Sequence, residues 1–256
     1  MQIMDTIISL GSSCDGANQL KRRGKQSKTH FFDFLWNEQG GLKTVTSILD
    51  NNFQHFNAID SYTKTNSHPY LAGFHKIKSS FNINIHYPEL VFMHHDTTKP
   101  AIIDSLQRKI ERTTELFQTC KNPIFIYYRH ICYDENIGPI IKEETEQFCA
   151  SFSSKYNPNF KIISCIMVEQ EYDTTKLDAI MKTLISHDNI IYDYLYARDD
   201  TNRVRNEVAN KRWDYIIEFA MSLHADGLQT VQHGRTQRHQ STHNCSGPLH
   251  PGQDRE

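Results

Sequence analysis

Short apolar runs alternate with amphipathic segments along most of the chain. Runs rich in β-branched and aromatic residues predict buried strands at residues 5–10, 123–129, 160–168 and 189–196. Apolar residues three and four positions apart predict helices at residues 41–56, 139–156, 174–187 and 206–223. A further helix is expected after Thr97 or Thr98, which would cap it, with Pro100 in its first turn.

The stretch from residue 57 to residue 93 interrupts this alternation. Its polar and aromatic part, residues 57–80, predicts a long surface loop. Strict alternation of apolar and polar residues at 81–86 predicts a half-buried strand, and residues 89–93 can pair with it as a hairpin.

Continuous apolar strands separated by amphipathic helices are typical of βαβ units. Such strands form a parallel sheet that helices cover on both faces. We therefore expect one α/β domain over residues 1–223, a Rossmann-like three-layer sandwich with a mostly parallel sheet of roughly five strands. Residues 224–256 hold five of the 14 histidines and few apolar residues, so we expect a disordered tail there.

Composition excludes several classes of partner. The formal net charge of -2 gives no electrostatic footprint for nucleic acid. No apolar run is long enough to span a membrane, and the N-terminus lacks the pattern of a signal peptide, so we expect a cytoplasmic protein. The six cysteines are scattered without a CxxC pair, which predicts reduced thiols and neither a metal site nor another cofactor.

The first strand leads into the run Ser9-Leu10-Gly11-Ser12-Ser13-Cys14. Gly11 permits a sharp turn, and Ser12 or Ser13 can cap a helix that begins there. Cys14 would then stand in the first helical turn, where the helix dipole favours a thiolate and lowers the thiol pKa, although Asp15 opposes this. The alternative is a small buried cysteine that closes a tight turn.

Other polar residues stand beside apolar ones or follow strands. Asp33 lies among four aromatic residues in Phe31-Phe32-Asp33-Phe34-Leu35-Trp36, and either caps the next helix or is held beside a site. Arg108 and Arg112 are one helical turn apart, which is most often a solvated face but can clamp an anion. Arg129 ends a strand, and ligands of parallel sheets bind beyond the carboxyl ends of the strands.

Taken in order, these motifs resemble a family of unknown function labelled as papain-like cysteine peptidases. The resemblance covers about residues 5–170 and lies in a Ser-Leu-Gly-x-x-Cys opening, a Phe-Asp block, a His-Asp pair, a helix with arginines and a strand that ends in Arg. The corresponding residues are Cys14, Asp33, His95-Asp96, Arg108 with Arg112, and Arg129. Phe31 and Phe34 replace the Pro and Trp of the family's block.

The family label implies a cysteine hydrolase, with Cys14 as nucleophile, His95 as base and Asp33 or Asp96 as the carboxylate that orients the base. Asp33 is the better orienter, since an Asp next to a His in sequence rarely reaches the same ring. His94 beside His95 leaves two candidates for the base. The label also suggests a papain architecture, but the strand–helix alternation predicts a parallel sheet instead.

Two other functions stay open. A transferase could receive a phosphate-bearing donor, such as a nucleotide sugar, at the turn from Gly11 to Ser13, with Arg129, Arg108 or Arg112 assisting. A binding domain without chemistry is the third possibility. The turn lacks the spaced glycines and the lysine of known phosphate-binding motifs, which favours the hydrolase. We expect a small-molecule, peptide or glycan substrate.

Overall fold

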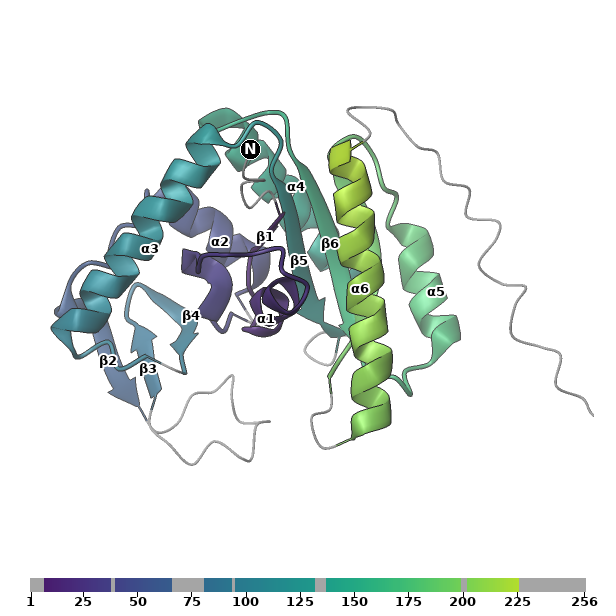
Figure 1. Cartoon of the computed structure of the whole chain (residues 1–256), viewed down its shortest axis with the longest axis horizontal. Helices are drawn as coiled ribbons and strands as arrows, with labels where there is room; N and C mark the ends of the chain where they lie inside the picture. Colours follow the sequence, from purple (N-terminus) through teal and green to yellow (C-terminus); the bar gives the residue numbers. More distant parts are fainter. Residues whose placement is uncertain are drawn as a thin grey trace, which may run out of the picture. The chain divides into compact units, whose positions relative to one another are not determined.

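Four of the apolar runs form a parallel sheet in the order β1-β5-β6-β7 (Figure 1). Its strands are β1 (Ile7–Ser9), β5 (Ile124–His130), β6 (Lys161–Val168) and β7 (Ile190–Tyr196). The computed structural model describes residues 7–37, 40–65, 81–93, 95–131, 137–198 and 202–225. The expected parallel sheet is confirmed, although it has four strands instead of about five.

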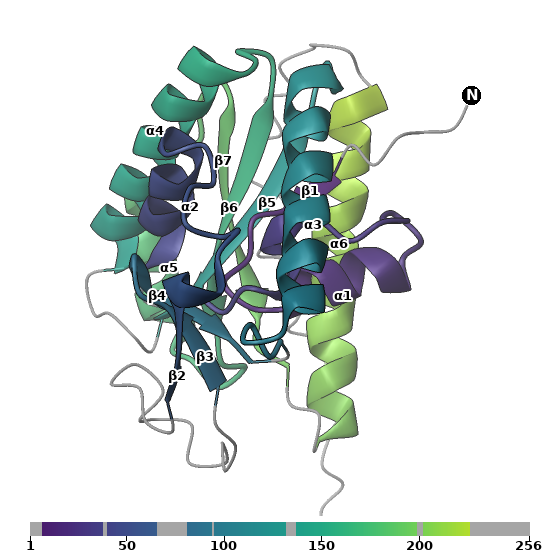
Figure 2. The same ribbon diagram turned by 90° about the vertical axis from the view of Figure 1, so that its left-hand side faces the viewer.

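Helices cover both faces of this sheet, as expected (Figures 1 and 2). One face packs against α1 (Asp15–Arg22) and α6 (Arg203–Ala225). The other face packs against α4 (Ile137–Lys155) and α5 (Thr174–Thr183), and α2 (Gly41–Asp50) lies against α4. The chain is therefore a three-layer α/β sandwich.

A second, antiparallel sheet lies beside the sandwich in the order β2-β3-β4. Its strands are β2 (Tyr62–Thr65), β3 (Phe81–Asn84) and β4 (Tyr87–Phe92), next to α3 (Pro100–Thr119). The predicted hairpin of residues 81–93 is confirmed. The loop predicted at residues 57–80 is wrong at residues 62–65, which pair with β3 as a strand. Residues 66–80 lie outside the described part of the chain.

Most predicted helices are found with shifted ends. The helix expected at 41–56 ends at Asp50, and the last helix begins at Arg203 instead of residue 206. Neither threonine caps α3: Lys99 holds the N-cap position, Thr97 is fully buried, and the Thr98 hydroxyl donates to Asp96. These shifts follow from tertiary packing, which local sequence does not report.

The central strand β5 divides the core into its two layers, because successive side chains of a strand point to opposite faces. Ile124, Ile126 and Tyr128 pack with α1 and α6. Phe125 and Tyr127 pack on the side of α2 and α4, and Arg129 faces the same side, where it reaches Glu144 on α4.

The ion pair of Arg129 and Glu144 is buried between β5, α4 and the start of α2. The two side chains are 8% and 10% exposed, and Nη1 of Arg129 lies 2.5 Å from Oε1 of Glu144. The other carboxylate oxygen accepts hydrogen bonds from the Leu42 amide (3.1 Å) and the Tyr127 hydroxyl (3.5 Å). One carboxylate thus links three elements of the sandwich.

Residues 226–256, most of the expected tail, lie outside the described residues, and α6 continues two residues past the expected end of the domain. Among the helices that the structure describes, none has the length and apolar character needed to cross a bilayer.

Removing the Glu144 carboxylate should be costly, because it takes the counter-ion from a buried arginine. We expect Glu144→Ala to lower the free energy of unfolding by about 3–5 kcal/mol in urea denaturation. Glu143→Ala, one residue earlier on the exposed side of α4, is the control and should change it by under ~0.5 kcal/mol. Equal effects of the two variants would contradict this role for Glu144.

Candidate functional site

The turn between β1 and α1 is shaped by two consecutive residues in left-handed conformations. Gly11 has φ +91° and Ser12 has φ +92°, a region that a side chain rarely adopts. Ser12 is buried, and its carbonyl accepts a hydrogen bond from the Asn37 amide at 3.0 Å. The turn therefore needs support from the surrounding protein, which offsets the cost of this backbone.

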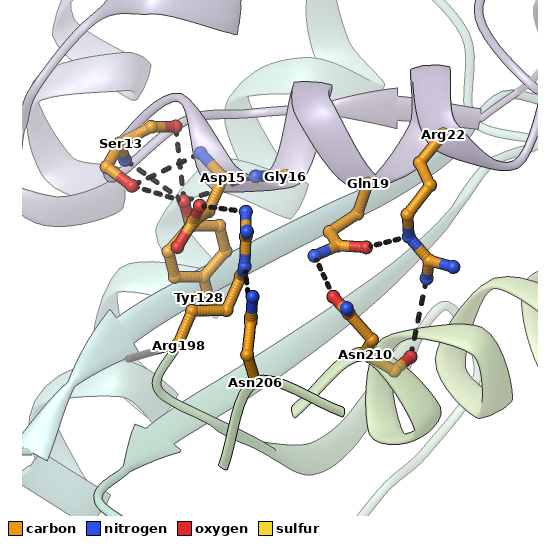
Figure 3. Close-up of polar contacts among 9 residues, drawn as sticks. All are labelled: Ser13, Asp15, Gly16, Gln19, Arg22, Tyr128, Arg198, Asn206 and Asn210. Atoms are coloured by element: carbon orange, nitrogen blue, oxygen red, sulfur yellow. Dashed lines mark hydrogen bonds and ion pairs between the residues drawn. The ribbon is translucent and has the colours of Figure 1, made fainter. Parts of the chain in front are cut away.

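Tyr128 on β5 supplies that support from beneath the turn (Figure 3). Its hydroxyl accepts from the amides of Ser13 (3.2 Å) and Gly16 (3.4 Å) and donates to the Ser13 carbonyl at 3.1 Å. It also lies 2.8 Å from the Ser13 hydroxyl. A Cβ atom at residue 16 would collide with Ser9 Oγ and crowd the Tyr128 ring, so glycine is required there.

Cys14 stands at the N-cap position of α1, just beyond the carboxyl end of β1. Neither Ser12 nor Ser13 therefore holds the N-cap position expected for one of them, although Ser13 Oγ accepts a hydrogen bond from the Asp15 amide at 3.3 Å. The thiol is partly exposed, and its side-chain interactions are with Asp15, Asn18 and Arg198. No described histidine is among the groups that shift the pKa of the Cys14 thiol.

The surroundings of Cys14 raise the pKa of its thiol instead of lowering it. Burial is the largest cause and the Asp15 carboxylate is the second, because both disfavour a thiolate. The Cys14 backbone, Arg198 and Asn18 act in the opposite direction but are outweighed. The predicted depression of this pKa is thus wrong, since the helix terminus does not compensate for burial and a neighbouring carboxylate.

Polar side chains connect α1 to α6 along the whole length of α1 (Figure 3). Near Cys14, Arg198 lies 3.3 Å from Asp15 and donates from Nε to Asn206 at 2.8 Å. Farther along, Gln19 donates to Asn210 at 2.8 Å, and Arg22 pairs with Asp214. These contacts fix the start of α1, where Cys14 stands, relative to the start of α6.

His95 lies between β4 and α3. Its Nε2 is 3.2 Å from the Nζ atom of Lys109 on α3, and its carbonyl accepts from Asn82. If the Lys109 ammonium donates, this Nε2 must be the unprotonated nitrogen of the ring. Burial is the largest cause that lowers the pKa of Lys109; Arg112 and Lys21 add to it, and Asp33 opposes it.

Asp33 is fully buried. Its Oδ2 accepts from the His30 amide at 2.6 Å and from the Gln26 side chain. Burial raises the pKa of Asp33 to about 6 from its ordinary 3.8. The carboxylate therefore fixes the start of the short helix at Phe31–Phe34, in which Asp33 itself lies. The expectation that Asp33 caps the next helix is wrong, because Gly40 holds the N-cap position of α2.

The second carboxylate predicted as an orienter, Asp96, also has local partners. Its side chain accepts from Thr98 and lies 3.6 Å from Lys99. The Thr98 hydrogen bond lowers the pKa of Asp96. His94 lies outside the described residues.

The residues predicted to clamp a phosphate are dispersed. Arg129 faces the α4 side of the sheet, whereas the Ser13 turn lies over the α1 side. Arg108 is exposed on α3, and Arg112 donates to the Thr29 carbonyl at 2.8 Å. The structure thus gives no common anion site of these arginines and the turn.

Sequence reasoning missed a histidine–carboxylate pair at the carboxyl ends of β5 and β6. Nε2 of His130 lies 3.4 Å from Oε1 of Glu169, and the His130 side chain is 16% exposed. Burial is the largest cause that lowers the pKa of His130, and Glu169 opposes it. A His directly after the strand-ending Arg129 was the available signal. Its pairing with Glu169 requires the β5–β6 register, which the sequence does not give.

The model of a family described as "putative papain-like cysteine peptidase" matches residues 5–181. The chain belongs to this family. No curated protein and no solved structure matches it. Membership supports a cysteine hydrolase as the general class and peptides as the substrates of such an enzyme.

A metal centre receives no support from the described residues, where no three His, Cys, Asp or Glu side chains are grouped to hold an ion.

The charges beside Cys14 predict opposite effects of two substitutions. Asp15→Asn removes a carboxylate that raises the thiol pKa, so alkylation of Cys14 by iodoacetamide at pH 8 should become several-fold faster. Arg198→Gln removes a cation that lowers this pKa and should slow the reaction. Asp214→Asn, in the same α1–α6 interface but paired with Arg22, is the control. The rates are read by peptide mass spectrometry, and unchanged rates in both variants would refute this account.

Asp33 predicts a pH-dependent stability. Its pKa is higher in the folded protein, so its contribution to stability is complete below pH ~4 and is lost as the pH rises through about 6. The total is of order 3 kcal/mol for a shift of this size. Asp33→Asn, which has no proton to lose, should remove this decline when urea unfolding is followed from pH 4 to pH 7. Parallel profiles of wild type and variant would contradict it; exposed Asp60→Asn serves as control.

Proposed function

We propose that this protein is a cysteine-dependent hydrolase in which Cys14 is the nucleophile. The supporting observation is the position of its thiol: partly exposed, at the start of α1, just past the carboxyl end of a strand in a parallel sheet. Ligands of such sheets bind at this edge. Membership of the cysteine peptidase family supports the same chemistry.

The reaction proposed is acyl transfer. The resting thiol is protonated, because burial and Asp15 raise its pKa, so a general base must take its proton as Sγ attacks the substrate carbonyl. The carbon–heteroatom bond then breaks, the leaving group departs with a proton, and a thioester remains on Cys14. Water hydrolyses this thioester and releases the acid and the free thiol.

The negative charge that develops on the carbonyl oxygen needs donors near Cys14. The amides of Ser13 and Gly16 already donate to Tyr128, and the Asp15 amide donates to Ser13. The side-chain amide of Asn18 and the guanidinium of Arg198 both stabilise negative charge at the thiol. We therefore assign them as the donors that stabilise the negative charge on the carbonyl oxygen. An acyl substrate of the peptide class suits this arrangement.

An activated ester tests the nucleophile without knowledge of the natural substrate. With p-nitrophenyl acetate, we expect a burst of p-nitrophenolate and one acetyl group on Cys14, located by peptide mass spectrometry and removed by hydroxylamine as a thioester is. Cys14→Ala should abolish the burst. Cys149→Ala is the matched control, because burial raises the pKa of that thiol to about 12 and should keep it unreactive.

Two results would overturn the proposal. One is a burst of equal size in Cys14→Ala. The other is acetylation of Cys14 in the wild type that is no faster than acetylation of the same cysteine in the urea-unfolded chain, which would make Cys14 a packing residue of the turn.

A further inference from the structure

The carboxyl edge of the parallel sheet gathers polar side chains from all four strands. Cys14 follows β1, His130 ends β5, Glu169 follows β6 and Arg198 follows β7. Parallel strands bring these ends to one edge. Arg198 reaches across this edge to Asp15, the neighbour of Cys14.

His130 lies on the same side of β5 as Tyr128, because residues two apart in a strand point to one face. Tyr128 holds the residues on either side of Cys14, Ser13 and Gly16, through its hydroxyl. His130 follows two residues later, about 7 Å farther toward the carboxyl edge. His130 therefore lies on the face of the sheet that carries α1, one strand away from β1, which leads to Cys14.

We propose that His130 is the general base for Cys14 and that Glu169 is the positioning residue that orients its ring. This inference rests on the proposed function. It replaces His95, which lies between β4 and α3 and whose Nε2 is 3.2 Å from the Nζ atom of Lys109.

The contact with Glu169 fixes which nitrogen acts. A carboxylate beside Nε2 keeps the proton on that nitrogen, so the lone pair is on Nδ1. As Sγ of Cys14 forms its bond to the substrate carbonyl carbon, its proton moves to Nδ1, and the same proton later passes to the leaving group. Glu169 stabilises the imidazolium between these steps. Burial, the dominant influence on the His130 pKa, keeps the resting ring neutral and able to accept a proton.

Cys14 and His130 are not hydrogen-bonded in this structure. Such contacts are often long in the free enzyme and shorten in the substrate complex.

The test is the pH dependence of Cys14 acylation by p-nitrophenyl acetate in His130→Gln, Glu169→Gln and His95→Gln. We expect His130→Gln to slow the burst at pH 7 by about 100-fold or more, the size of a general base contribution. The limb of the wild-type profile that reports the base should vanish, so that the rate follows thiol ionisation alone. Glu169→Gln should slow the burst about 10-fold and shift that limb, with folding unchanged. His95→Gln should stay within about twofold, because His95 takes no part in the transfer.

The outcomes separate this inference from the proposed function. If Cys14 is acylated in a burst that His95→Gln abolishes and His130→Gln does not, His130 is not the base, while Cys14 remains the nucleophile. If wild-type Cys14 gives no burst, both ideas fail. Loss of activity in His130→Gln through unfolding would be seen as a lowered melting temperature. In that case Glu169→Gln gives the decisive measurement, because the Glu169 side chain is exposed and the variant should fold. If the limb of its pH profile that reports the base were the same as in the wild type, the proposal would be overturned.

Discussion

The alternation of side chains along β5 is the constraint on which the site depends. Tyr128 and His130 point to one face of the sheet, and Tyr127 and Arg129 point to the other. A shift of one residue in the register with β1 or β6 would exchange the two sets. Arg129 would then lose its carboxylate partner, and the turn before Cys14 would lose the hydroxyl that supports it. The buried ion pair and the candidate nucleophile are therefore fixed by the same strand.

Tertiary contacts stabilise the unfavourable backbone conformation of the turn before Cys14. Two consecutive left-handed residues are unfavourable in an isolated chain, above all at Ser12, which carries a side chain. The Asn37 amide on one side and the Tyr128 hydroxyl beneath satisfy the backbone groups of Ser12 and Ser13. These contacts also occupy amides that would otherwise be open to a bound phosphate. The geometry that presents the thiol thus weakens the case for a phosphate-bearing donor.

Sequence patterns predicted the sandwich because its signals are local. Apolar runs and helical spacing mark each βα unit without reference to its neighbours, and seven of these elements recur at nearly the predicted positions. The site was harder to predict, since its residues meet only through the fold. Asp33, His95 and Arg112 were found as motifs, but they gather around Lys109 or its neighbours instead of Cys14. Arg198, His130 and Glu169 belong to no motif, and the parallel strand order alone brings them to one edge of the sheet.

The family match does not reach the last strand and the last helix of the sandwich. The matched region ends at residue 181, before β7 and α6. Yet Arg198, just after β7, is among the groups that lower the thiol pKa, and Asn206 on α6 holds this arginine. Opposite influences on Cys14 thus come from the two parts of the chain: Asp15 within the matched region raises the pKa, and Arg198 beyond it lowers the pKa. The balance of charges that sets the pKa of the candidate nucleophile is consequently a property of the assembled four-stranded sheet, because neither part of the chain holds both charges.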